Sequence, residues 1–439
     1  MGINKGKNVP KSIKRYSAAT LPEPATLTQG ALLVVDDQLQ IKHPFGGVAA
    51  IPYRTPAPAR KTIRPFGKSD TSAAILGQTG HITLLSRVPF YALRFNFVNG
   101  STNTINNLKA CFAVPDANPT PCVTTASWTN ITVGGATSFN MNAAASAEQP
   151  TFTASDIIPC RCVKRKDGLG YLIMVRLYTP SSGNTVGPRT SGTSDLSAAD
   201  SLDKLGMQVG FWTGDGVTTP ASFVRSTGAL GCPVFVELFS SDITTPVLLI
   251  SGDSIAGGQG GGDAGAPTAH QYGTYKQYAN YRGWIAMCGA ISGNKSPDFV
   301  QQGIDKYISQ VRPRYAIVPP WSINDDDALV AGVEQRILYN MVRWLDACYQ
   351  VDAIPVFLTP APKNGISVAQ ETVRRSVVQA VKQFCASNNV LCIDRDSIWT
   401  DYSTNTGGYK AGISADVLHP NAAGYALELE LWKQVLGTV

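Results

Sequence analysis

Histidine and charge are what this sequence has little of. Its 439 residues include four histidines, and charged residues make up 15% of the chain against 44% hydrophobic ones. None of the histidines has the spacing to cysteine or carboxylate partners that a metal site needs, so we expect no metal and no cofactor. The nine cysteines are an odd number scattered along the chain, which does not resemble a disulfide framework. The composition is that of a globular protein.

Long apolar runs are missing as well. No segment is apolar over the length that crosses a bilayer, and the N-terminus lacks the hydrophobic stretch of a signal peptide. We therefore expect a protein without a membrane span that is made in the cytoplasm. The net charge of +6 is mild. Nucleic-acid binding usually needs a concentrated basic face, so we expect no nucleic-acid partner.

Basic residues gather only near the N-terminus. Residues 1–30 have no hydrophobic periodicity, and up to Arg15 they contain no acid. Such a stretch can be a solvated, flexible terminus or an arm that binds an anion or a neighbouring subunit. We predict an arm over residues 1–30, with neighbouring subunits of a larger assembly as its partners. Its basic residues are Lys5, Lys7, Lys11, Lys14 and Arg15.

Residues 31–243 have the texture of an all-β domain. After a proline-containing connecting segment, short runs rich in β-branched and aromatic residues are separated by loops of Ser, Thr, Gly and Asn. This pattern is typical of antiparallel β-sandwiches and jelly rolls. The predicted strands are residues 82–88, 90–98, 171–178, 208–212 and 234–239.

From residue 244 to residue 439, strand-like runs alternate with segments of helix length. This alternation predicts parallel strands joined by crossovers, with helices on both faces of the sheet, and therefore a three-layer α/β/α domain. We assign four charged residues of the predicted helix 327–350 to a solvated face: Glu334, Arg336, Arg343 and Asp346. The predicted strands are 247–251, 285–290, 315–319, 354–359 and 390–394, and the predicted helices are 272–284, 297–311, 327–350, 368–387 and a last one from 421.

Ser254 follows the first of these strands. The apolar run 247–250 ends abruptly in Ser-Gly-Asp-Ser at 251–254, at the edge where open α/β sheets place their ligands. A serine needs a base before it can act as a nucleophile. His419 can be that base, because Asp416 stands three residues before it and can orient the imidazole ring. The alternative is a plain His-Pro turn, with Asn421 capping the last helix.

Two loops after the next strands can supply donors for an oxyanion. Ser-Gly-Asn at 292–294 follows the second predicted strand, and Ile-Asn-Asp at 323–325 follows the third. Both lie at the edge that carries Ser254, although each by itself is more often a simple turn. Trp321 either lines a substrate pocket or is a core aromatic under its loop.

The four blocks occur in one order between residues 252 and 420. Gly-Asp-Ser-Ile, Ser-Gly-Asn, Ile-Asn-Asp and Asp-x-x-His-Pro together resemble the SGNH hydrolases, also called the GDSL esterase/lipase superfamily, over residues 245–439. The resemblance implies that Ser254 is the nucleophile and one oxyanion donor through its backbone N–H. It implies that Gly293 and Asn324 are the other donors. It also implies that His419 is the base, oriented by Asp416. Ser322 departs from the family, which usually has glycine there.

The glycine-rich stretch 257–265 contains a formal match to a dinucleotide-binding motif. Gly-x-Gly-x-x-Gly at 260–265 starts nine residues after Ser251, whereas that motif belongs directly after the strand. We therefore interpret the stretch as a loop beside the active serine. His270, just beyond it, and Trp321 are the candidate substrate-binding residues.

The resemblance implies serine-dependent ester hydrolysis through an acyl-enzyme. Members of the family often remove O-acetyl groups from polysaccharides, and an appended β-sandwich commonly helps to hold glycans, so we expect an acylated carbohydrate as substrate. The alternative is a structural or receptor-binding subunit of a virion or phage tail, whose hydrolase domain is accessory or vestigial. The presence of Ser254, Asp416 and His419 together favours an active enzyme.

Overall fold

The computed structural model describes most of residues 77–437. The gaps in that range are 100, 116–126, 146–150, 166–167, 169, 181–206, 218–223, 226–233, 243 and 261–272, and before residue 77 only five short strands are described. The chain forms two compact units, Met1–Ala59 and Arg60–Val439. None of the described helices is long and apolar enough to cross a membrane.

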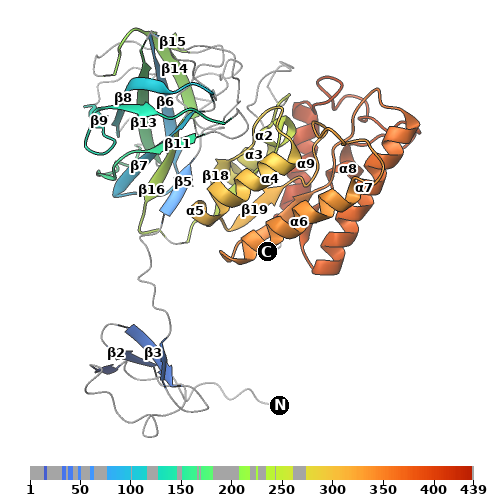
Figure 1. The fold of residues 1–439 in the computed structure, drawn as a ribbon, viewed down its shortest axis with the longest axis horizontal. Coiled ribbons are helices and arrows are strands. Elements are labelled where there is room, and N and C mark those ends of the chain that lie inside the picture. The colour runs from blue at the N-terminus through green and yellow to red at the C-terminus, as the bar shows by residue number, and fades with distance from the viewer. Residues whose placement is uncertain are drawn as a thin grey trace. The chain divides into compact units, whose positions relative to one another are not determined.

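The first unit contains a small sheet that the sequence analysis did not predict. Its four strands follow the order β1-β2-β3-β4, with β1 parallel to β2 and the other neighbours antiparallel. The predicted arm over residues 1–30 lies outside the described residues except for β1. The strands are β1 (Lys14–Tyr16), β2 (Leu32–Val35), β3 (Gln38–Lys42) and β4 (Val48–Ala50) (Figure 1).

The second unit begins with two antiparallel sheets, as the sequence predicts. One sheet has the order β10-β8-β13-β6-β14-β15 with β9 beside β8, and the other has the order β11-β7-β16-β5 with β12 beside β7. The strands are β5 (Arg60–Ile63), β6 (Gln78–Ser86), β7 (Ala92–Asn99), β8 (Ile105–Ala113), β9 (Thr129–Ile131), β10 (Ser138–Met141), β11 (Thr151–Ala154), β12 (Ile158–Pro159), β13 (Tyr171–Thr179), β14 (Met207–Thr213), β15 (Val224–Arg225) and β16 (Val234–Phe239).

Aromatic side chains join the two sheets into a sandwich. The rings of Phe95 on β7 and Phe112 on β8 lie 5.3 Å apart, and those of Phe97 and Phe139 lie 5.0 Å apart. All five predicted strands of this region are present. Strand β8 is not apparent from the sequence, because Asn106, Asn107 and Lys109 face solvent and interrupt its apolar run. Asn107 also has a positive φ of 56°, which breaks the alternation of a regular strand.

The remainder of the second unit is built on a parallel five-stranded sheet of order β18-β17-β19-β20-β21. The chain leaves β17 toward β18 on one side and then returns past it to β19 on the other. The carboxyl end of β17 is therefore the topological switch point of the sheet, where α/β folds bind their ligands. The strands are β17 (Val247–Ile250), β18 (Ile285–Cys288), β19 (Tyr315–Val318), β20 (Ile354–Leu358) and β21 (Leu391–Ile393).

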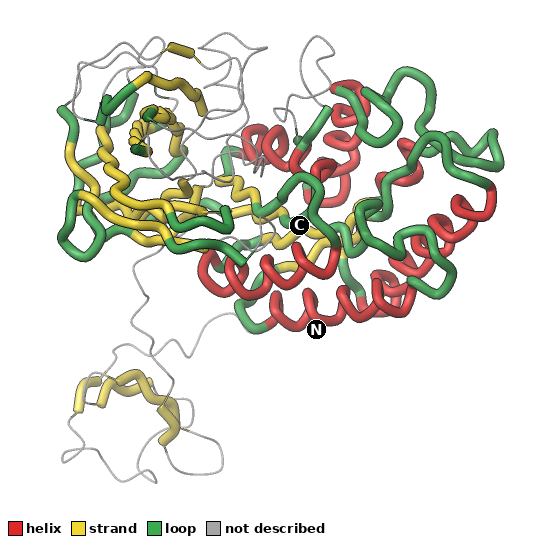
Figure 2. The backbone as a smooth tube through the Cα atoms, turned by 45° about the horizontal axis from the view of Figure 1, so that its top comes forward, coloured by secondary structure: helices red, strands yellow, loops and turns green. Residues whose placement is uncertain are grey.

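Helices cover both faces of this sheet (Figure 2). The crossovers place α3 on one face, where it contacts α9, and place α4, α6 and α7 on the other, where α6 contacts both α4 and α7. The three-layer α/β/α prediction is confirmed. The helices are α2 (Ser254–Gly257), α3 (Thr274–Arg282), α4 (Ser296–Gln302), the π-helical turn η4 (Gly303–Ile308), α5 (Ser309–Val311), α6 (Glu334–Tyr349), α7 (Val368–Asn388), α8 (Arg395–Trp399) and α9 (Ala422–Leu436).

The sandwich packs against the α/β domain at its β18 edge. Strand β5 lies beside β18. The ring of Phe152 meets that of Tyr307 at 6.2 Å, and the Lys61 ammonium donates to the Thr245 carbonyl at 2.5 Å. The buried apolar residues of both parts form one continuous core. The predicted boundary near residue 244 lies in the segment that joins β16 to β17.

Candidate active site

Ser254 lies at the carboxyl end of β17, on a sharp turn into α2. Gly252 makes the turn possible, because its φ is +156° and a Cβ there would lie 2.4 Å from that of Ala256. Asp253 then caps the short helix, since its Oδ1 accepts from the backbone N–H groups of Ile255 at 3.0 Å and Ala256 at 3.3 Å. The turn therefore holds Ser254 at the edge of the sheet.

Three side chains from two distant segments form a hydrogen-bonded chain. His419 Nε2 lies 2.9 Å from Ser254 Oγ, and His419 Nδ1 lies 2.8 Å from Asp416 Oδ2. A carboxylate only accepts hydrogen bonds, so the ring proton is on Nδ1 and the Nε2 lone pair faces the serine hydroxyl. This arrangement is the one in which a histidine can take the proton of a serine nucleophile.

Asp416 is held in its charged form. Burial raises the pKa of its carboxyl, but hydrogen bonds from the His419 side chain and from the backbone N–H groups of Leu418 and His419 outweigh burial and lower the pKa below its usual value. The two backbone bonds measure 2.6 and 2.7 Å. Asp416 is therefore ionised wherever the imidazole needs an acceptor.

Hydrogen bonds of Asn421 and Tyr425 hold the loop that carries His419 in place. Asn421 caps α9 by accepting from the Gly424 N–H at 3.1 Å, so the capping role that the sequence offered as an alternative exists beside the catalytic geometry. Tyr425 on α9 donates toward the carbonyl oxygens of Ile255 at 3.0 Å and Gln259 at 2.9 Å. These contacts tie the histidine loop to the serine helix, although the two are far apart in sequence.

The two predicted oxyanion loops lie on either side of the serine turn. Gly293 has a φ of +80°, which favours glycine, and its loop follows β18. The loop is bonded to the serine turn through Ile291 N–H and Gly252 O at 2.9 Å. Asn324 follows β19, and one of its two amide protons goes to Asn294 O at 3.1 Å. The second amide proton is left for another acceptor.

Ser322 connects the serine turn to the Asn324 loop. Its side chain is buried, and its Oγ donates to Asp253 Oδ2 at 2.6 Å. The same Oγ accepts from the Asn324 N–H at 3.2 Å. Ser322 is not among the described residues with positive φ, so no glycine conformation is required at this position. The departure from the family pattern thus adds a hydrogen bond rather than strain.

A buried carboxylate that the sequence analysis did not single out supports these loops. Asp325 accepts from Ser296 N–H at 2.6 Å and from Ser296 Oγ at 2.7 Å, and it pairs with Arg336 at 3.0 Å. Burial raises the pKa of Asp325, and the hydrogen bonds and Arg336 oppose this. The assignment of Arg336 to a solvated face was wrong. Arg336 also donates a hydrogen bond to Asp327. Helix α6 begins seven residues later than predicted, because residues 327–333 form turns.

The remaining candidates lie elsewhere. Trp321 is buried among core residues, and its indole N–H donates to Ala328 O at 3.0 Å, which favours the core aromatic of the two alternatives. His270 and residues 261–265 of the glycine-rich stretch lie outside the described residues.

His81 is buried in the sandwich, where burial and then Arg176 lower its pKa to about 3. Within the described part of the chain, no group of His, Cys, Asp and Glu could hold a metal ion.

Comparison with known proteins identifies the domain that carries this site. Residues 250–427 match the model of the GDSL-like lipase/acylhydrolase family. The C-terminal domain belongs to that family. It is a carboxylic ester hydrolase domain, as the sequence motifs predicted. No curated protein matches the chain.

Solved structures similar to the GDSL domain come from several bacteria. A GDSL-like lipase from Bacteroides thetaiotaomicron is 16% identical, with 44% of this chain and 87% of that chain covered and a TM-score of 0.35. A psychrotrophic esterase from Pseudoalteromonas is 15% identical over 44% and 98%, with a TM-score of 0.33. A catalytic mutant of an acetylxylan esterase from Geobacillus stearothermophilus is 19% identical over 44% and 94%, also with a TM-score of 0.33.

Proposed function

We propose that this protein is a serine esterase that removes short acyl groups, with Ser254 as nucleophile, His419 as base and Asp416 as the residue that orients the base. The observation that carries the proposal is the hydrogen-bonded chain from Asp416 Oδ2 through His419 to Ser254 Oγ, with distances of 2.8 and 2.9 Å. No other described histidine approaches a serine at a sheet edge in this way.

The proposed reaction has two halves. His419 Nε2 takes the proton of Ser254 Oγ as the oxygen attacks the ester carbonyl, and then gives that proton to the departing alcohol oxygen. The acyl group is left on Ser254. In the second half, His419 takes a proton from water, the hydroxide attacks the acyl-enzyme, and the acid is released while the serine is restored.

The oxyanion formed in each half needs hydrogen-bond donors. We assign the backbone N–H groups of Ser254 and Gly293 and the side-chain amide of Asn324 to this role. Among the described residues neither backbone N–H has an acceptor, and the Asn324 amide has a proton to spare. Donors that are already oriented and cost no reorganisation stabilise the developing charge most effectively.

We further propose an O-acetylated carbohydrate as the substrate. The described loops around Ser254 are short and polar, and α2 ends in Gly257 and Gly258 rather than in an apolar lid. A long acyl chain needs a broad apolar surface, so this surrounding favours a short acyl group. The family resemblance and the sandwich, which shares one core with the GDSL domain, favour a carbohydrate as the alcohol.

The test compares three proteins on two kinds of ester. Wild type and Ser397→Ala, a control at an exposed serine on α8, should release nitrophenol from p-nitrophenyl acetate, and Ser254→Ala should not. Full activity in Ser254→Ala would refute the esterase proposal. Acetate release from an acetylated xylo-oligosaccharide then tests the substrate. Hydrolysis of p-nitrophenyl acetate without any acetate release from acetylated sugars would refute the carbohydrate part alone.

A further inference from the structure

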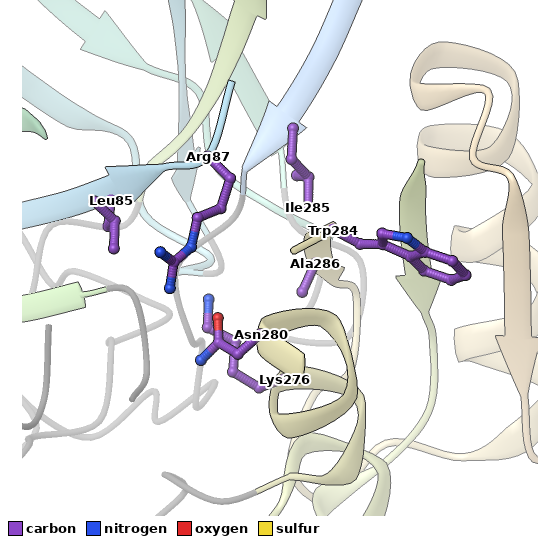
Figure 3. A pocket seen from close by; sticks show the side chains of 7 residues that line it. All are labelled: Leu85, Arg87, Lys276, Asn280, Trp284, Ile285 and Ala286. Atoms are coloured by element: carbon purple, nitrogen blue, oxygen red, sulfur yellow. The ribbon is translucent and has the colours of Figure 1, made fainter. Parts of the chain in front are cut away.

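A small cavity lies where the sandwich meets the GDSL domain, away from Ser254. Figure 3 shows three polar side chains directed into it: Arg87, which follows β6 of the sandwich, and Lys276 and Asn280, one turn apart on α3. The remaining wall is apolar and includes Trp284 and Ile285 at the start of β18. The cavity volume of about 20 Å³ is room for one particle of about the size of a water molecule.

Lys276 is the unusual residue of this cavity. The residue is only 7% exposed. The described residues provide neither a hydrogen-bond acceptor nor a carboxylate for its ammonium group. Burial lowers the pKa of Lys276 to about 8, the Cys288 thiol opposes the shift, and the positive charge of Arg87 adds to it. At neutral pH the ammonium is therefore still mostly charged, and it lies near a second cation.

Among the described residues no carboxylate compensates the charge of Lys276, and a buried charge without such a partner is strongly destabilising. A water molecule in the cavity would accept a hydrogen bond from Lys276 but would leave the charge in place. A small anion would accept a hydrogen bond from Lys276 and would also compensate its charge. The ammonium of Lys276, the guanidinium of Arg87 and the amide N–H of Asn280 are all donors suited to an anion. We propose that this cavity is a binding site for one small inorganic anion, chloride being the probe, which holds the sandwich against the GDSL domain.

The first experiment measures thermal unfolding of the full chain in potassium chloride and in potassium gluconate at equal ionic strength. Gluconate is too large for the cavity, so it controls for screening. Chloride should raise the Tm in a saturable manner, by on the order of 1–3 °C for a weakly held ligand. Lys276→Met should abolish this rise. Lys306→Met, which removes another half-buried lysine at the same contact between the two parts, should retain it.

A direct measurement covers the case in which Lys276→Met does not fold. Crystals of the wild-type protein soaked in sodium bromide should show an anomalous peak between Lys276 and Arg87. A water molecule with no bromide signal in the cavity would overturn the proposal. A chloride effect of equal size in Lys276→Met and wild type would overturn it as well. Ester turnover enters neither experiment, so the result is independent of the proposed function.

Discussion

Replacing Ser322 tests how the two halves of the site are held together. Ser322→Ala removes the 2.6 Å hydrogen bond to Asp253 Oδ2 and leaves that buried oxygen without its hydroxyl donor, while Oδ1 still caps α2. Buried hydrogen bonds to charged groups contribute about 1.5–3 kcal/mol. We expect the free energy of unfolding to fall by about that amount.

The effect on catalysis should be smaller than the effect on stability. Ser322 touches neither the hydroxyl of Ser254 nor the substrate. It acts through Asp253 and through the Asn324 N–H that it accepts. If about 1–1.5 kcal/mol of this energy is also lost from the stabilisation of the transition state, kcat falls by roughly 5- to 13-fold. The KM for p-nitrophenyl acetate should change little.

The assay measures kcat, KM and urea unfolding for wild type, Ser322→Ala, Ser322→Gly and Ser296→Ala. Ser322→Gly restores the residue that the family usually has, yet it should lose kcat like Ser322→Ala, because both remove the hydroxyl. Ser296→Ala is the matched control. Ser296 is buried and donates to the carboxylate of Asp325 at 2.7 Å but does not contact Asp253. It should lose stability while retaining most of kcat. Unchanged kcat in Ser322→Ala, or a change confined to KM, would refute the reasoning.

Four further results are expected. Asn324→Ala should lower kcat by about 10²- to 10³-fold with KM nearly unchanged in steady-state assays, because an oxyanion donor acts mainly on the transition state. A kcat–pH profile should fall on acidification, since His419 must be neutral to accept a proton. The pKa of Asp416 is lowered, so this carboxylate stays ionised while kcat falls. A kcat that stays constant until the pH at which carboxyl groups titrate would contradict the role of His419 as base. p-Nitrophenyl acetate should be hydrolysed faster than the decanoate under matched conditions. Deleting residues 1–30 should leave ester turnover intact and abolish any higher assembly seen by light scattering; an inactive variant that still assembles would place the segment in the catalytic fold.

Much of the candidate site could be predicted because its residues occur in short motifs, within which they are close together in the sequence. Gly252, Asp253 and Ser254 are adjacent, and Asp416 stands three residues before His419, so each half of the hydrogen-bonded chain lies within a few neighbouring residues. The alternation of strands and helices then predicts a parallel sheet, and the carboxyl ends of parallel strands lie at one edge. The predicted strands of the sandwich were right for a similar reason, since β-branched and aromatic runs report on local burial.

What could not be predicted depends on residues that meet only after folding. Ser322 reaches Asp253 across 69 positions and Arg336 reaches Asp325 across 11. No local pattern tells such a partner from a solvated polar residue. Trp321 had two open roles because burial is decided by the loop that closes over it.

The sequence by itself therefore determined the order of the layers, which rests on periodicity, and, through the resemblance of its four ordered blocks to the SGNH hydrolases, it named the candidate residues of the site. Only the tertiary structure decided that His419 Nε2 lies 2.9 Å from a serine 165 residues away. It also decided that Ser322, which stands where the family usually has glycine, donates a hydrogen bond to Asp253, and that Lys276 is buried near Arg87. Distances between side chains of different elements follow from packing the whole core, which no single segment contains.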